Sequence, residues 1–213
     1  TDLQDVLFGT PYPIQGEINL GVLKPDHVNV LVHGHEPLLS EMIVIAAQDH
    51  ELIEYAKSKG AKGIVLAGLC CTANEILVRH GMPVAGNYLQ QELAIVTGCV
   101  DAVIVDVQCI MENIANVAKC YHTEIITTDP RAMIESGDVR HIEFDEHHAL
   151  EDARKIVRTA IDNYPNRKSE PMVPKAKERM VVGFSSEAIA YHLGGTFRGS
   201  YTPLNDNIIN GRI

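Results

Sequence analysis

Five residues with imidazole or thiol side chains stand shortly after apolar stretches of this sequence. They are His33, His35, Cys70, Cys71 and Cys109. Thiolates together with imidazole suit zinc, nickel, copper(I) or iron–sulfur chemistry far better than magnesium or calcium. The sequence therefore predicts part of a site for a soft metal, provided that the fold brings these residues together.

Three apolar runs, interpreted as parallel strands, would bring the five residues together. The runs are Val28–Val32, Gly63–Ala67 and Ala102–Val107, and each ends just before one group of the candidate ligands. The carboxyl ends of parallel strands share one edge of a sheet, and open α/β folds bind their ligands outside that edge. We therefore expect the imidazole and sulfur groups to meet there.

The cysteines differ in what their surroundings predict. Cys70 and Cys71 precede a predicted helix, whose amino-terminal dipole favours the thiolate form that binds metal. Adjacent residues do not easily reach one small centre, so one ligand and one structural neighbour are expected. Buried thiols that pack as small hydrophobic groups are the alternative for this pair and for Cys109. Cys99 and Cys120 stand at predicted helix carboxyl ends, where the dipole disfavours a thiolate, and are expected only to pack.

The histidines also have alternative interpretations. A single His after a strand is more often hydrogen-bonded than metal-bound, but His33 and His35 flank a glycine and accompany thiols, which favours a ligand. Glu36 either fixes a histidine tautomer or is favoured near a helix start. His147 and His148 are explained as the exposed first turn of a long helix. No Cys-x-x-Cys pair supports a zinc site, and no Walker loop or dinucleotide-binding loop is present.

Composition narrows the class of protein. The chain has 213 residues, 46% of them hydrophobic and none of them Trp, so its core must consist of aliphatic side chains, as in buried parallel sheets. The net charge of −10 argues against a nucleic-acid partner. Five cysteines, an odd number with two adjacent, favour reduced thiols and a cytoplasmic location. No apolar stretch approaches the roughly 18 residues of a membrane span, and no signal peptide is recognisable.

Strand and helix patterns alternate along most of the chain. Strands are expected at 28–32, 63–67, 83–85, 102–107, 124–127 and 141–144, and helices at about 37–59, 72–80, 89–97, 111–118, 129–135 and 145–163. Such βα units predict an α/β fold with a doubly wound parallel sheet and helices on both faces. The expected organisation is an irregular lead-in over 1–27, the metal-binding domain over 28–164, a linker over 165–179, and the start of a small second α/β domain over 180–213, with a helix at 185–193.

Several motifs together resemble the catalytic subunit of anaerobic nickel–iron carbon monoxide dehydrogenase. The ligand-bearing motifs are Leu31–Pro37, Gly68–Glu75 and Asp106–Met111, and further matches are Leu7–Pro11, Gly21–Pro25 and Gly183–Glu187. They follow in order over nearly the whole chain. The resemblance implies a Rossmann-like middle domain that helps to hold a nickel–iron–sulfur cluster, which reversibly oxidises CO with water to CO2, two protons and two electrons.

The resemblance also implies roles for the candidate ligands. At the matching positions, His35 and Cys71 would hold the iron outside the cubane portion of the cluster, and Cys109 would hold an iron of the cubane. His35 is preferred over His33 because it directly precedes the acidic-Pro turn, and Cys70 would be a neighbour of the cluster.

Other features of the family are missing from the sequence. Further cluster cysteines, including the nickel ligand, and the cysteines of the additional [4Fe–4S] clusters lie outside this chain, which resembles a fragment of the subunit and is expected to be inactive alone. For the full-length enzyme, the resemblance implies a homodimer and an acetyl-CoA synthase or ferredoxin partner. Two alternatives are a hybrid-cluster relative that reduces hydroxylamine-like substrates, and a metal-free α/β scaffold or assembly domain.

Overall fold

The computed structural model describes residues 13–107, 109–135, 138–183 and 207–212. The chain divides into two compact units, one of residues Gln15–Val181 and one of Thr1–Ile14 with Val182–Ile213. The first unit contains the sheet and the helices that are described below. The expected division into a lead-in over 1–27, a domain over 28–164, a linker over 165–179 and a second domain over 180–213 stays a prediction.

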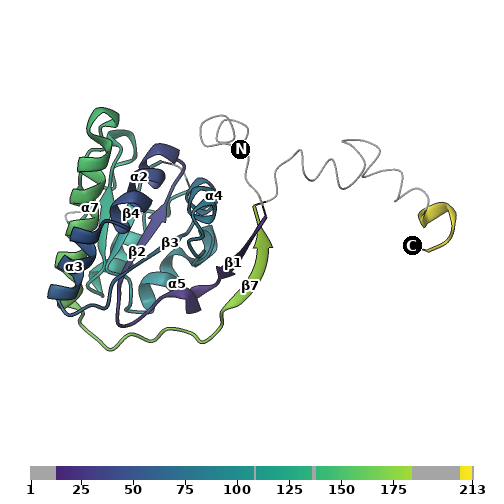
Figure 1. Cartoon of the computed structure of the whole chain (residues 1–213), viewed down its shortest axis with the longest axis horizontal. Coiled ribbons are helices and arrows are strands. Elements are labelled where there is room, and N and C mark those ends of the chain that lie inside the picture. Colours follow the sequence, from purple (N-terminus) through teal and green to yellow (C-terminus); the bar gives the residue numbers. More distant parts are fainter. Residues whose placement is uncertain (1–12, 108, 136–137, 184–206, 213) are drawn as a thin grey trace. The chain divides into compact units, whose positions relative to one another are not determined.

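A five-stranded parallel sheet forms the centre of the first unit (Figure 1). In spatial order its strands are β3 (Ile64–Gly68), β2 (Val28–His33), β4 (Ala102–Val105), β5 (Glu124–Thr127) and β6 (Arg140–His141). Every neighbouring pair is parallel. From β2 the chain first forms β3 on one side and then crosses to β4 on the other, which creates the switch point where open α/β sheets bind ligands. The predicted doubly wound parallel sheet is confirmed.

Helices cover both faces of this sheet. One face packs against α2 (Pro37–Ala47), α3 (His50–Ser58) and α7 (Ala149–Asn163), and the other against α5 (Gln91–Val96) and α6 (Ile114–Lys119). Alternate residues of β2 serve the two faces, as the period of a strand requires: Val30 and Val32 pack on the first, and Leu31 on the second. All six β2 residues are buried, and β2 lies between β3 and β4 in the sheet.

The helices begin and end at different residues from those expected. The single helix predicted over 37–59 is two helices, because Asp49 caps α3 by accepting a hydrogen bond from the Glu51 N–H at 2.8 Å. The helix expected over 72–80 is α4 (Cys71–Arg79), which begins one residue earlier, with Cys70 in the cap position. Asp145 caps a 3-10 turn, Glu146–His148, that leads into α7.

Three weaker patterns give less regular structure than expected. The strand predicted at 83–85 is reduced to bridges from Val84 to Ile18 and Gly68. The helix predicted at 129–135 is one 3-10 turn, Pro130–Ala132, and the strand at 141–144 is the two-residue β6. Short segments with little periodicity carry too little local information to fix an element.

Outside the main sheet, β1 (Ile14–Ile18) pairs with β7 (Glu178–Val182) in a two-stranded sheet. The helix expected at 185–193 lies outside the described residues. No helix in the described part of the chain is both long and apolar enough to cross a membrane.

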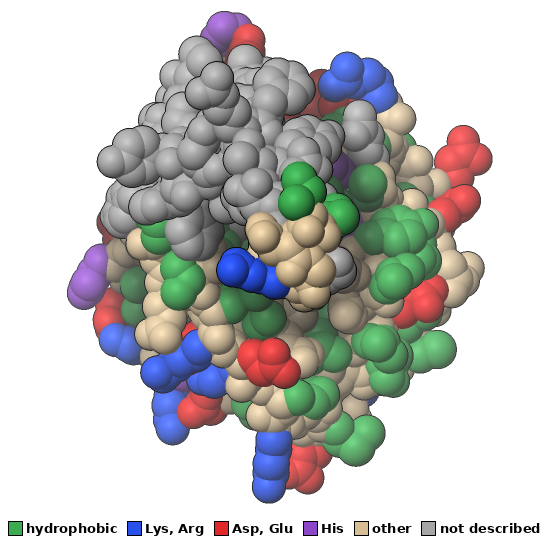
Figure 2. Space-filling view, turned by 90° about the vertical axis from the view of Figure 1, so that its right-hand side faces the viewer, with side chains coloured by type: hydrophobic (Ala, Val, Ile, Leu, Met, Phe, Trp, Pro, Cys, Tyr) green, Lys and Arg blue, Asp and Glu red, His purple; other side chains and the backbone are tan. Residues whose placement is uncertain are grey.

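The surface also carries hydrophobic side chains, several of which gather on the face shown in Figure 2. Leu89, Leu93 and Val96 are exposed and stand four and three residues apart, so they form one stripe along α5 and the turn before it. Contiguous apolar surface of this kind is more typical of an interface than of a freely solvated face.

Candidate metal centre

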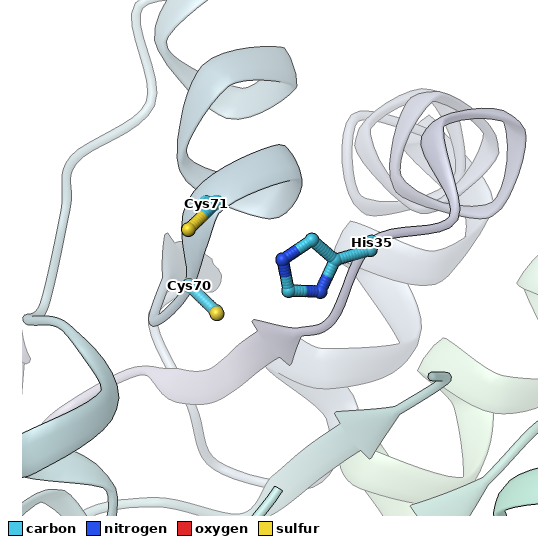
Figure 3. Close-up of side chains that lie close together, drawn as sticks. All are labelled: His35, Cys70 and Cys71. Carbon is cyan, nitrogen blue, oxygen red and sulfur yellow. The ribbon is translucent and has the colours of Figure 1, made fainter. Parts of the chain in front are cut away.

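The loops that follow β2 and β3 bring His35, Cys70 and Cys71 together. One ligand atom from each side chain lies within 4.8 Å of the others, and Figure 3 shows the imidazole extending toward the two cysteines. The strand register explains this: Val32 of β2 is level with Gly68 of β3, so the two strands end at the same edge. The imidazole and the two thiols thus lie close together at the carboxyl edge of the sheet.

Cys109, in the loop after β4, completes the cluster of side chains. Its Sγ lies 4.0 Å from Nε2 of His35, and the side chain is exposed beside a hollow of about 460 Å³ lined in part by Met133 and Ile134. His33 of β2 is level with Val105 of β4, which aligns this third loop with the other two. The three loops around the switch point therefore supply one imidazole and three thiols.

The His35 ring is oriented by a backbone carbonyl. Its Nδ1 lies 3.2 Å from the carbonyl oxygen of Val107. Because a carbonyl only accepts hydrogen bonds, this contact places the ring proton on Nδ1 and leaves the lone pair of Nε2 directed toward the thiols. Metal-binding histidines are commonly oriented by such a hydrogen bond at the other ring nitrogen.

Asp106 connects the loops that follow β2 and β4 by hydrogen bonds. Its carboxylate accepts hydrogen bonds from the backbone N–H groups of His35 at 2.7 Å and Glu36 at 2.9 Å, and from that of Val107. Burial raises the pKa of Asp106, whereas these three donors act in the opposite direction. This role of Asp106 was not among the predictions, although a carboxylate directly after a buried strand and before a candidate ligand was a usable signal.

Gly34 allows this close approach. A Cβ atom at position 34 would lie 1.6 Å from Oδ1 of Asp106, much closer than any real contact. The glycine between the two histidines is therefore required so that the carboxylate can reach the backbone of the His35 turn.

The two adjacent cysteines lie in different environments. Cys70 is only 3% exposed, and burial, reinforced by the nearby Cys71 and Cys109 thiols, raises its pKa to about 12. The expectation that the helix start favours a thiolate is thus outweighed at Cys70. Cys71 is exposed at the first residue of α4. Both thiols are within reach of His35, and the exposure favours Cys71 as the metal ligand.

His33 lies beneath the site and outside the group of converging donors. It is completely buried, neither ring nitrogen makes a hydrogen bond of normal geometry, and burial lowers its pKa, opposed by the nearby Gln91 side chain. Glu36 caps α2 by accepting from the Leu39 N–H, which supports the helix-start interpretation of that residue.

The remaining candidates take no part in the cluster of donors. Cys99 is fully buried and accepts a hydrogen bond from Asn29 at 3.3 Å, as its expected packing role requires. Cys120 is exposed, so the prediction that it packs in the core is wrong. His147 and His148 are exposed in the turn before α7, as expected.

The converging donors fit a soft metal or an iron–sulfur group. They offer sulfur and imidazole nitrogen, and no carboxylate belongs to the group found among the described residues. Thiolate and imidazole are the ligands expected for zinc, nickel or iron–sulfur centres.

Comparisons with known proteins are consistent with this chemistry. A family model described as the Prismane/CO dehydrogenase family matches residues 1–213. Carbon monoxide dehydrogenase 1 of Methanosarcina mazei is 58% identical over 214 residues, which cover 100% of this chain and 33% of that protein. The chain thus spans about a third of the length of this relative.

Two solved structures are similar in fold and sequence. A nickel-free carbon monoxide dehydrogenase from Thermococcus sp. AM4 has a TM-score of 0.85 and 51% identity, covering 97% of this chain and 32% of that one. The other is an acetyl-CoA synthase/carbon monoxide dehydrogenase, described with NiZn[Fe4S4] and NiNi[Fe4S4] clusters in its alpha subunits. It has a TM-score of 0.85 and 46% identity, and the match covers 100% of this chain and 32% of that chain.

Proposed function

The chain belongs to the Prismane/CO dehydrogenase family, and on this premise we propose that it forms part of a carbon monoxide dehydrogenase. The reaction is the reversible oxidation of CO with water to CO2, two protons and two electrons. The chain's contribution is to hold one side of a nickel–iron–sulfur cluster with side chains from three loops. The convergence of His35, Cys71 and Cys109 at the switch point of the sheet is the observation that supports this most strongly.

Each of the three residues has a defined task in this proposal. His35 presents Nε2 as a ligand while Val107 holds its other nitrogen. Cys71 provides a thiolate at the start of α4, where the helix dipole stabilises negative charge. Cys109 provides a second thiolate from the opposite side of β2. When bound, the metal–sulfur group supplies a soft site for CO and an acceptor for the two electrons.

The alternatives explain the site less well. A metal-free scaffold has no need for three thiols and an oriented imidazole at one edge. A hybrid-cluster relative would use more carboxylate ligands, and none joins the donor group in the described residues. The similar proteins described above are carbon monoxide dehydrogenases, which favours the same activity here.

The wider setting of the enzyme is part of the proposal. We propose a cytoplasmic enzyme whose full-length subunit binds further [4Fe–4S] clusters, forms a homodimer, and transfers electrons to ferredoxin or associates with an acetyl-CoA synthase. The similarity to an acetyl-CoA synthase/carbon monoxide dehydrogenase supports the last of these partners.

Replacement of Cys71 by Ala in the full-length subunit tests the ligand assignment. Mutation of a residue that only hydrogen-bonds to a metal ligand typically lowers activity ~10–100-fold. Loss of the ligand itself should reduce nickel-dependent CO oxidation by more than this, and should lower the iron content. Anaerobic dye reduction under CO and metal analysis measure both.

The matched control is Cys120→Ala, which removes an exposed thiol outside the cluster and should leave rate and metal content unchanged. A Cys71→Ala enzyme with normal iron, nickel and rate would show that Cys71 is not a ligand.

A further inference from the structure

Cys109 adopts a backbone conformation that its residue type disfavours. Its φ is +52°, in the left-handed region where a Cβ atom crowds the following carbonyl group. Besides Cys109, Asn19 is the one non-glycine residue with positive φ in the described part of the chain. A conformation of this kind persists only where the surroundings hold it, and such residues concentrate at functional sites.

Gln91, the first residue of α5, holds the backbone on both sides of this strained position. Its Nε2 donates to the carbonyl oxygen of Cys109 at 3.2 Å, and its Oε1 accepts from the N–H of Met111 at 3.1 Å. The two contacts use the donor and the acceptor of the amide at once, so they fix which way the amide group faces. They close a small ring of contacts around Cys109–Met111.

The burial of Gln91 makes these two hydrogen bonds important. Gln91 is 1% exposed, and a buried amide without partners is costly, so the loop and the side chain stabilise one another. Ile110 and Met111 pack against the hydrophobic core on the same face of the sheet, which anchors the loop at its far end. The Cys109 thiol remains exposed and directed toward His35 Nε2, 4.0 Å away.

We propose that Gln91 is a positioning residue, which holds the Cys109 loop in its left-handed conformation so that the thiol faces His35 and the cluster. The predicted effect on catalysis rests on the proposed function. The structural part of the inference, that the buried Gln91 amide orients the Cys109 thiol, does not depend on the proposed function.

The experiment compares three variants of the full-length subunit. Gln91→Met keeps the length and packing of the side chain but removes both hydrogen bonds. Gln91→Glu keeps an acceptor for the Met111 N–H and loses the donor to Cys109. Glu92→Ala is the matched control, because Glu92 joins the same helix to Asn113 by a hydrogen bond on the exposed surface.

The first measurement is the alkylation rate of Cys109 in metal-free protein, followed by peptide mass spectrometry, with Cys120 as internal reference. Gln91→Met should change the Cys109 rate by about threefold or more, since a thiol's reactivity follows its local environment. Gln91→Glu should give a smaller change, and Glu92→Ala none. The Cys120 rate should stay constant in all three.

The second measurement uses the reconstituted enzyme. Gln91→Met should alter the electron paramagnetic resonance spectrum of the cluster at retained iron content and lower kcat by about tenfold or more, as expected for a displaced ligand. Retained thermal unfolding temperature excludes a general loss of structure. If Gln91→Met is unstable, the same readouts on Gln91→Glu decide.

The outcomes separate the two proposals. Unchanged Cys109 reactivity and cluster spectrum in both Gln91 variants would overturn the positioning role, as would equal changes at Cys120 or in Glu92→Ala. A wild-type subunit that binds no nickel–iron cluster would instead contradict the proposed function, while the alkylation series still decides the role of Gln91.

Discussion

At the scale of single residues, the site depends on one glycine and one carboxylate. Asp106 accepts hydrogen bonds from three backbone N–H groups, two of them in the turn that carries His35. Position 34 has no room for a Cβ atom beside this carboxylate. The orientation of His35 is therefore set by its neighbours in space, more than by its own side-chain preferences.

Gly34→Ala tests this contact. The added methyl group must displace Asp106 or the turn, so the variant should lose about 1–3 kcal/mol of stability, the usual cost of overpacking, and should bind less metal. Chemical denaturation and metal analysis measure these effects.

Gly60→Ala is the control that separates the effect of backbone strain from the effect of the Asp106 contact. Gly34 has a φ of +154° and Gly60 a φ of +94°, but nothing lies within 4 Å of a Cβ added at Gly60, so only the conformational cost remains there. Unchanged metal binding in Gly60→Ala and reduced binding in Gly34→Ala are expected. Normal metal binding by Gly34→Ala would contradict the role of the Asp106 contact.

At the scale of elements, the two edges of the sheet have different tasks. The carboxyl edge carries the candidate ligands, whereas the amino edge is held by a buried ionic network around Asp101. Asp101 lies just before β4 and accepts from Arg167 at 2.7 Å, from His122 at 2.9 Å and from the Asn29 backbone at 2.7 Å. Arg167, from the segment expected as a linker, is thereby fixed to the starts of the strands.

Arg167→Met should destabilise the fold without changing the metal site. Asp101 is completely buried and the Arg167 side chain is 12% exposed, and removal of one partner of a buried pair costs about 3–5 kcal/mol. The double variant Asp101→Asn/Arg167→Met should recover part of this loss, because no unpaired charge remains. Urea denaturation of the metal-free protein measures both.

The exposed pair Lys57–Glu54 provides the control, since both side chains are about half exposed. Lys57→Ala should change stability by no more than ~1 kcal/mol. Equal effects of Lys57→Ala and Arg167→Met would show that the network at the amino edge adds little.

At the scale of the whole molecule, the chain carries one side of a site. The described residues supply four soft donor side chains, the His35 imidazole and three thiols near it, and the chain spans about a third of the length of a relative such as the Methanosarcina mazei enzyme. In the proposed enzyme, further ligands come from other parts of the subunit.

The 213-residue chain alone should therefore not oxidise CO. After anaerobic reconstitution with iron, sulfide and nickel, dye reduction under CO should stay at background, whereas the full-length subunit treated in the same way should be active. Sustained nickel-dependent oxidation by the chain alone would contradict this expectation.

The sequence by itself determined the type of fold and the chemistry of the site. Mainly apolar runs such as 28–32 and 102–107 are typical of buried strands, and their alternation with helices favours a parallel sheet. The shared edge of that sheet then places His35, Cys71 and Cys109 near one another. These inferences were accessible because they depend on local patterns and on one general rule of topology.

Only the tertiary structure decided how the ligands are held. The hydrogen bond from the His35 N–H to Asp106 joins residues 71 positions apart. The hydrogen bonds of Gln91 to Cys109 and Met111 join residues 18 and 20 positions apart. The position of Asp106 after a strand could mark it as a candidate, but the partners of a buried carboxylate or amide are decided only by the folded chain. For the same physical reason, the high pKa of Cys70 follows from burial, which no sequence pattern around it reveals.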